Sequence, residues 1–172
     1  EISGNTFAEI KNTGTGAGTS NAAGVFVSGN MNGTIGCGLD AAIDDACSNT
    51  FASITSTARF AAGVDVGRRS AGGDLGSADG STPGTIRGNH FGTISGAVNG
   101  RNWMAGAGHF NLIPTAGIVI GGSVNLDSEI SGNTFAEITN TSDAAGVFVW
   151  GNMNGTIGCG LDVAIDDACS NT

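Results

Sequence analysis

The stretch Glu1-Ile-Ser-Gly-Asn-Thr-Phe-Ala-Glu-Ile10 returns without a change at residues 129–138. A shorter motif recurs inside that long period about every forty residues. It reads Asn-x-Phe-x-x-Ile and is followed by Ala-Gly-(Val/Ile)-x-(Val/Ile). Its copies begin at Asn5, Asn49, Asn89 and Asn133, and Asn171 opens a fifth. A fixed internal period of this length is the sequence signature of a stacked repeat architecture.

The shortest copy, residues 116–138, predicts three short strands. Ile118 and Ile120 alternate with Val119 in the first strand, Ile130 belongs to the second, and Phe135 and Ile138 supply the apolar side of the third. Such period-2 alternation indicates half-buried strands. None of the three is long enough to be stable alone. We therefore expect like strands of successive copies to pair in parallel and in register around one shared apolar core.

The other copies are the same coil of about 23 residues with insertions that fall where turns are expected. Residues 11–21, 68–84 and 95–115 are such insertions, and the Gly-, Ser- and Asp-rich segment 68–84 has the composition of a surface loop. We treat residues 1–172 as one domain with coils at about residues 22–54, 61–94, 116–138 and 144–172. Three coils form the long repeat, in which residues 1–50 are similar to residues 129–172.

This pattern resembles the right-handed parallel β-helix of pectin-lyase-like proteins and of bacterial autotransporter passenger proteins. The resemblance rests on (Thr/Glu)-Ile-x-Gly-Asn-x-Phe and on Ala-Gly-(Val/Ile)-x-(Val/Ile), and it covers essentially the whole chain. It implies an all-β fold, a right-handed single-stranded parallel β-helix of about four coils with turn insertions. It also implies an asparagine ladder at the bend between the second and third strands, and asparagine suits a repeated sharp bend. The matching residues are Asn5, Asn49, Asn89, Asn133 and Asn171.

All four cysteines lie in one duplicated segment, at Cys37 and Cys47 and again at Cys159 and Cys169. An even count at one fixed spacing favours disulfides, Cys37 to Cys47 and Cys159 to Cys169, and an oxidising compartment. A zinc site and free buried thiols remain alternatives, although the two histidines are far away in sequence. Between the cysteines, Leu39 and Ile43 share a helical face, which predicts one or two short helical turns.

Composition limits the partners of the chain. Six basic residues stand against fifteen acids, for a net charge of −9. Nucleic acid is therefore not expected as a partner, because duplex binding depends on neutralising phosphates with Lys and Arg. No apolar run approaches the roughly 20 residues of a membrane-spanning helix. We expect an extracellular or cell-surface protein without a membrane span in this segment.

An enzyme is the alternative that the resemblance itself suggests. Lyases of that fold use clustered acids for calcium and an arginine beside the first sheet, and hydrolases use close aspartates. Here Asp65 is the one acid expected to point outward from the first strands, and Arg59, Arg68 and His90 are scattered around it. We expect no catalytic, metal-binding or cofactor-binding residue. A carbohydrate-active β-helix enzyme or a polysaccharide-binding module stays as the alternative, since fold alone does not confer function.

The outward column of the first strand is a candidate contact face, made of Phe26, Val119, Phe148 and Trp150. An exposed apolar column implies cover by loops, by a partner chain or by a ligand such as a glycan or a host-surface molecule. An ice-binding face would need a regular threonine array, which His90 interrupts between Thr50 and Thr134.

Tandem repetition favours length in a stalk over a catalytic site. The favoured hypothesis is a structural or adhesive repeat module of a bacterial surface protein or fibre. We expect copies to associate end to end, because no capping segment is visible and an open coil edge templates further pairing.

Overall fold

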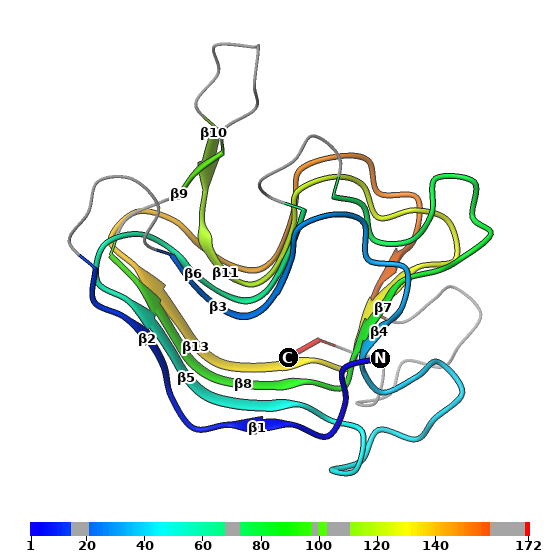
Figure 1. Cartoon of the computed structure of the whole chain (residues 1–172), viewed down its shortest axis with the longest axis horizontal. Coiled ribbons are helices and arrows are strands. Elements are labelled where there is room, and N and C mark those ends of the chain that lie inside the picture. The colour runs from blue at the N-terminus through cyan, green and yellow to red at the C-terminus, as the bar shows by residue number, and fades with distance from the viewer. Residues whose placement is uncertain (15–20, 68–72, 98–99, 103–110, 159–170) are drawn as a thin grey trace.

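The computed structural model describes residues 1–14, 21–67, 73–97, 100–102, 111–158 and 171–172. The regular secondary structure of these described residues consists of β-strands alone. Parallel strands form three stacked sheets, and the chain passes repeatedly from one sheet to the next (Figure 1). The first sheet contains β3 (Ala22–Val27), β6 (Ala61–Val66), β11 (Thr115–Ile120) and β14 (Ala144–Val149). The second sheet contains β4 (Thr34–Gly36), β7 (Thr85–Arg87), β12 (Glu129–Ser131) and β15 (Thr156–Ile157). The third sheet contains β1 (Thr6–Phe7), β2 (Ile10–Asn12), β5 (Thr50–Ser56), β8 (His90–Gly96) and β13 (Thr134–Asn140).

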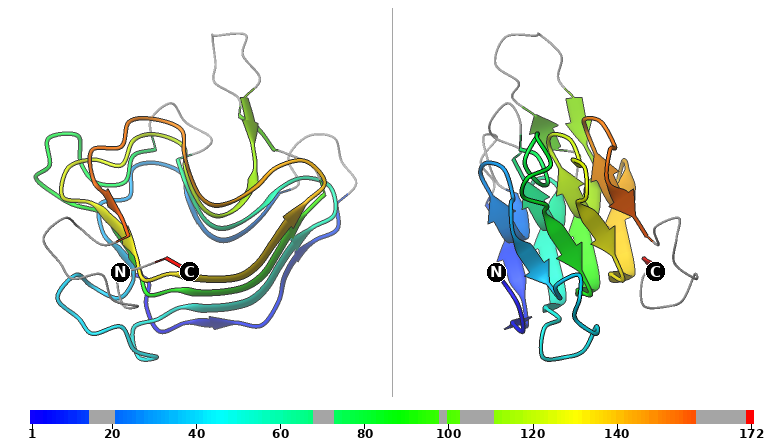
Figure 2. Two further views of the ribbon diagram at one scale, coloured as in Figure 1. Left: turned by 180° about the vertical axis from the view of Figure 1, so that it is seen from behind. Right: turned by 90° about the vertical axis from the view of Figure 1, so that its right-hand side faces the viewer.

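The predicted register is confirmed in all three sheets. In the first sheet Val64 pairs with Val25 on one side and with Ile118 on the other. In the second sheet Ile86 lies between Ile35 and Ile130 in the same way, and in the third Phe91 lies between Phe51 and Phe135. Each strand therefore carries its apolar side chains directly above those of the strand below. Figure 2 shows the coils following one another in a single direction, with the two ends of the chain on opposite sides of the stack.

The core consists of columns of like side chains. The rings of four phenylalanines stack with centroids 4.8, 5.0 and 5.3 Å apart and nearly parallel planes, in the order Phe7, Phe51, Phe91 and Phe135. The isoleucine column of the second sheet is fully buried at Ile35, Ile86 and Ile130. One continuous apolar cluster therefore runs through the stack, as the in-register pairing of strands requires.

The glycine of the Ala-Gly-(Val/Ile) motif makes room for the phenylalanine column. A Cβ on Gly24 would lie 2.6 Å from the ring of Phe51, and the rings of Phe91 and Phe135 would clash more severely with a Cβ on Gly63 and Gly117 respectively. The motif thus couples two sheets, because the ring that follows in the chain fills the space beside the glycine. That relationship explains why glycine recurs inside a strand, where it otherwise weakens pairing.

The interpretation of residues 68–84 as an inserted surface loop was wrong for part of that segment. Leu75 is fully buried and forms a bridge with Met31 in the coil before and with Val124 in the coil after. Val124 in turn bridges to Met153. A fourth apolar column therefore lies between the first and second sheets, and Leu75 interrupts the Gly-, Ser- and Asp-rich composition of the segment because the core needs one apolar side chain there.

The insertion at 95–115 contains the one antiparallel pair among the described residues. β9 (Gly100–Asn102) and β10 (Asn111–Ile113) form a hairpin that stands away from the coils beside the first sheet (Figure 1). The sequence predicted only an enlarged loop at this place. The hairpin adds to the parallel sheets without interrupting them, since β8 and β11 keep their pairing on both sides.

Candidate functional site

The five asparagines lie one above another at the bend into the third sheet. The side-chain amide nitrogen of each donates to the side-chain oxygen of the next, at 3.0, 2.9, 2.9 and 3.1 Å along the series Asn5, Asn49, Asn89, Asn133 and Asn171. The three inner residues are fully buried. Their amides also donate to main-chain oxygens of the preceding turn, for example Asn89 Nδ2 to Ile35 O at 3.1 Å. The ladder thus satisfies buried polar groups that the bend would otherwise leave without partners.

The sequence reasoning missed a second hydrogen-bond ladder. Its members come directly before the residues of the fourth apolar column in the chain, and they are Asn30, Asp74, Ser123 and Asn152. The side-chain oxygen of Asn30 accepts from the backbone N–H of Asp74 at 3.1 Å, and Asp74 Oδ1 accepts from the N–H of Ser123 at 2.7 Å. Ser123 Oγ then accepts from the N–H of Asn152 at 3.1 Å. The available signal was a polar residue directly before Met31, Leu75, Val124 and Met153 in every coil. The second ladder runs opposite to the first, because here the later coil donates and the earlier one accepts.

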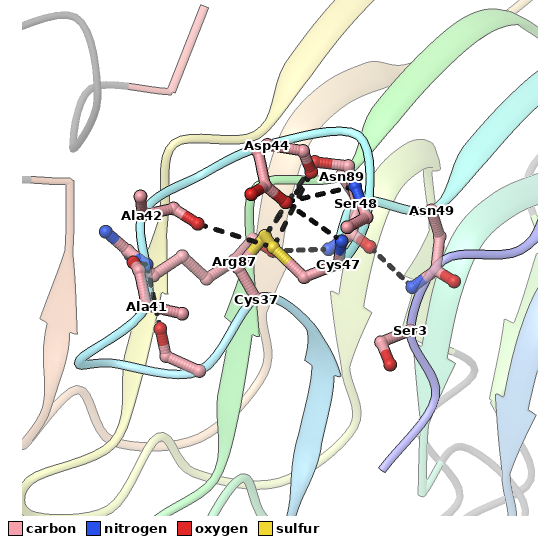
Figure 3. Close-up of a disulfide and its surroundings, with 12 residues drawn as sticks. Ser3, Cys37, Ala41, Ala42, Asp44, Cys47, Ser48, Asn49, Arg87 and Asn89 are labelled. Atoms are coloured by element: carbon pink, nitrogen blue, oxygen red, sulfur yellow. Dashed lines mark hydrogen bonds between the residues drawn. A yellow bond between two sulfur atoms is a disulfide. The ribbon is translucent and has the colours of Figure 1, made fainter.

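The predicted disulfide between Cys37 and Cys47 is present (Figure 3). Its α-carbons are 4.8 Å apart, within the usual range for such a bond. The bond closes the lobe 37–47 at its base, beside the buried Asn49 of the ladder. Cys159 and Cys169 lie outside the described residues.

The lobe between the cysteines is built from separate turns. Asp44 O accepts from the N–H of Ser48 at 2.9 Å, which forms a single helical turn, and Asp44 Oδ1 accepts from the N–H of Ala46 at 3.0 Å. The expected face shared by Leu39 and Ile43 does not become a helix, and Asp44 Oδ1 accepts from the N–H groups of Ala46 and Cys47 in the turn that follows it. Leu39 is instead exposed.

Arg87 attaches this lobe to the next coil. From β7, its Nη1 donates to Gly38 O at 2.8 Å and to Ala41 O at 2.7 Å, while Nε lies 3.8 Å from Glu129 Oε1. Figure 3 shows the side chain of Arg87 extending to Ala41 of the lobe. The lobe is therefore held covalently at its base and by charge-assisted hydrogen bonds at its middle.

The candidate contact face is divided by the structure. Register places Phe26, Asp65, Val119 and Phe148 side by side on the outer face of the first sheet. Val119 is fully buried in a small second cluster with Phe60, Ala62 and Ala116, and Phe148 packs partly against this cluster. Phe26 and Trp150 are exposed at 43% and 38%. The chain itself thus covers the middle of the face and leaves the aromatic side chains at its two edges.

Two of the residues weighed for catalysis, Asp65 and His90, lie on different sheets. Asp65 is fully buried on β6 of the first sheet, whereas His90 belongs to β8 of the third sheet, and Arg68 lies outside the described residues. Within the described ranges, no three side chains of His, Cys, Asp or Glu come together in a way that could hold a metal ion. No described helix is long and apolar enough to cross a membrane.

A shallow hollow of about 460 Å³ lies along the third sheet, at the row formed by Thr50, His90 and Thr134. Thr50, His90 and Thr134 are aligned by register, and His90 Nδ1 lies 2.8 Å from Thr134 Oγ1. The hollow is lined by Thr50, Phe51, Ala52, His90, Phe91, Gly92, Thr134, Phe135, Ala136 and Thr172. His90 interrupts this row of threonines as predicted, so the row is not a uniform threonine array.

Exposed large apolar side chains gather in the outermost coils. Of the seven that the described residues contain, five lie at the first or last level of the stack, outside the lobe 37–47: Ile2, Phe26, Trp150, Met153 and Ile157. Inner members of the same columns are buried: Ile157 is 41% exposed, for example, against 0% for Ile86. The apolar surface of this chain is therefore concentrated where another coil would stack.

Comparison with known proteins supplies no relative: no family model, curated protein or solved structure matches the chain.

Proposed function

We propose that this chain is a structural or adhesive repeat module of an extracellular or bacterial surface fibre, built as a right-handed parallel β-helix whose coils continue end to end with further copies. The observation that carries the proposal is the contrast between inner and outer coils. Ile157 and Met153 occupy the same columns as the fully buried Ile86 and Leu75, yet both are more than 40% exposed. Stacking of one more coil would bury them, which supplies an apolar driving force for continuation.

The two hydrogen-bond ladders support the same proposal through their polarity. On the side of the first coil, Asn5 Oδ1 accepts no bond from another described residue, and the backbone N–H of Asn30 donates none. On the side of the last coil, the amide of Asn171 is a donor and Asn152 Oδ1 is an acceptor. Donor therefore faces acceptor at both ladders only when copies stack in the same direction.

The disulfide supports an oxidising compartment for the proposed module. Cys37 and Cys47 form a bond that persists in oxidising surroundings, such as the outside of a cell. The surface adds an acidic net charge of −9, which keeps separate copies apart at low ionic strength. A module of a secreted or surface fibre combines these two properties.

Sedimentation velocity tests the proposal on the oxidised chain. We expect larger species to grow with protein concentration and with salt, because salt screens the repulsion between acidic copies. The variant Ile157→Lys places a charge on an exposed column residue and should shift the distribution toward monomer. Leu126→Lys is the matched control: Leu126 is 58% exposed but belongs to none of the stacked columns. A stable monomer at every concentration and salt level, or equal effects of the two variants, would contradict end-to-end stacking.

A second candidate is a polysaccharide-binding module or carbohydrate-active β-helix protein. It is favoured by Phe26 and Trp150, which are exposed beside the first sheet, with the rings of Trp150 and Phe148 6.2 Å apart. Tryptophan fluorescence titrated with soluble polysaccharides, repeated on Trp150→Ala and Trp103→Ala, tests it. A saturable change that depends on Trp150, or release of reducing sugar, would support this candidate over the fibre module.

A further inference from the structure

Three of the four Ala-Gly-(Val/Ile) glycines share one relationship with a phenylalanine. The ring that follows in the chain lies where a Cβ of the glycine would be, for Gly24 with Phe51, Gly63 with Phe91 and Gly117 with Phe135. The fourth, Gly146, has the same place in β14, next to the pair of Ala145 with Ala116 in β11. Among the described residues, the atoms nearest to a Cβ at Gly146 belong to Phe135 and are 3.9 Å away. Gly146 therefore has space that its three counterparts lack.

The two residues that would precede a ring at this place are already in register. Asn171 Oδ1 accepts from Asn133 Nδ2 at 3.1 Å, as the other ladder asparagines do. The N–H of Thr172 donates to Asn133 O at 3.0 Å, and Thr172 O accepts from the N–H of Phe135 at 2.6 Å. In the preceding coil the N–H of Thr134 donates to Asn89 O at 2.9 Å in the same way. Asn171 and Thr172 thus begin a new strand on the edge of β13.

We propose that Gly146, Phe135, Asn171 and Thr172 form a docking site for the next strand of the same repeat, with a phenylalanine ring seated against Gly146 and stacked on Phe135. We call it the Gly146 site. The occupant is a Phe-Ala-x-Ile strand from a further copy of this repeat, because each of the four ladder asparagines before Asn171 is followed two residues later by phenylalanine. The half-buried ring of Phe135 offers the stacking surface that Phe91 offers to Phe135 at 5.3 Å.

This inference rests on the proposed function and specifies how one coil recognises the next. Recognition is by shape as well as by hydrogen bonds: only a strand with an aromatic ring at that position fills the space beside glycine. A Cβ on Gly146 would occupy the space meant for the ring, as it would at the other three glycines. The same substitution should therefore be tolerated while the site is empty and become harmful when the site is filled.

The experiment joins residues 51–66 directly after Thr172, so that the junction Asn171-Thr172-Phe51 reproduces the local sequence of Asn49-Thr50-Phe51. Gly146→Ala is made in the 172-residue chain and in the extended chain, and thermal unfolding of all four proteins is followed by circular dichroism. We expect the extension to raise Tm. We expect Gly146→Ala to change Tm by about 1 °C or less in the original chain and to lower it by roughly 2–12 °C in the extended chain, the range of an overpacked core.

The control is an extended chain in which the appended phenylalanine is replaced by alanine, which should lose most of the gain and with it the sensitivity to Gly146→Ala. Equal loss of Tm in the original and extended chains would overturn the inference, because the site would already be filled. A stabilising extension that is insensitive to Gly146→Ala would overturn it too while leaving end-to-end continuation in place. An extension that fails to raise Tm would contradict the proposed function itself.

Discussion

Arg87 donates from Nη1 to the carbonyl oxygen of Gly38 at 2.8 Å, across the step from one coil to the next. The side chain of Arg87 is largely buried, with 13% of its surface exposed; its bond to Gly38 is partly buried, and its second bond, to Ala41, is exposed. The disulfide lobe therefore depends on a residue of the following coil as well as on its own cysteines.

We predict that Arg87→Met loosens the lobe without unfolding the stack. Loss of a hydrogen bond from a charged donor costs about 1.5–3 kcal/mol, so urea unfolding should show a decrease of roughly that size. Amide exchange in residues 38–47 should become faster. Lys11→Met, which removes a cation from an exposed position, serves as the control and should leave both measurements unchanged. Unchanged exchange in the lobe of Arg87→Met would show that the disulfide alone holds it.

The asparagine ladder predicts a difference between inner and outer positions. Asn89→Ala removes the acceptor for Asn49 and the donor to Ile35 in a fully buried place. We expect the free energy of unfolding to fall by about 2 kcal/mol or more, since each buried polar group left without a partner costs about 1–3 kcal/mol. Asn5→Ala, at the exposed end of the ladder, should cost clearly less. Equal losses for both variants in denaturant titrations would argue against a cooperative ladder.

The packing of Phe91 on Gly63 predicts that Gly63→Ala destabilises the chain. The added methyl group would meet the ring and the backbone of Gly117, and overpacking of this kind costs about 1–3 kcal/mol. Gly29→Ala is the matched control, because nothing lies within 4 Å of a Cβ at Gly29. That variant should be neutral or slightly stabilising, since alanine restricts the unfolded chain. A neutral Gly63→Ala would show that the ring can move aside.

Asp79 predicts a local pH response. Hydrogen bonds from the side chain and backbone of Ser81 lower the pKa of the fully exposed Asp79 carboxyl from 3.8 to about 2. The folded pKa is depressed, so the contribution of these bonds is present above pH 3.8 and is lost as the pH falls through about 2. Ser81→Ala should raise the pKa of Asp79 toward 3.8, as measured by NMR titration of the carboxyl carbon. No change in that variant would assign the shift to other neighbours.

The duplicated cysteine segment predicts a second local bond, Cys159 to Cys169. Mass spectrometry of a digest prepared without reduction should find two peptides, each bridged within its own segment. Replacing Cys37 and Cys47 with alanine should lower stability by about 2–3 kcal/mol, the value for closing a loop of this size. Alkylatable thiols at Cys159 and Cys169, or a bond between the two segments, would contradict the pairing.

The strands and their register could be predicted because each coil repeats the same apolar positions. Phe91 and Ile94 are spaced as in every other copy, and in-register stacking is the arrangement that buries all of them. The role of Leu75 was missed, although Met31, Val124 and Met153 hold the same place in the other coils, because the number of residues between this position and the second strand differs from coil to coil. The hairpin of β9 and β10 was missed for a different reason: Gly100–Asn102 and Asn111–Ile113 occur in one copy only, so no second copy reveals their pairing.

The candidate sites also differ in how far the sequence could predict them. The ladder asparagines and the bond between Cys37 and Cys47 follow from repetition, which marks structural positions. The buried state of Val119 and the open space beside Gly146 depend on which coils lie above and below, and this information is absent from the local sequence. Burial and open space of this kind can be assigned only when the order of the strands in each sheet is known.

The pairing of Asn171 and Thr172 with β13 also bears on how such a chain can change over generations. The dipeptide occupies the same level of its coil as Asn49 and Thr50, so the long repeat can be cut and rejoined at this point with the asparagine ladder and the strand register preserved. Unequal recombination between the duplicated gene segments would then lengthen or shorten the protein by three coils at a time. A deletion that is not a whole number of coils would instead bring unlike side chains into the phenylalanine and asparagine columns.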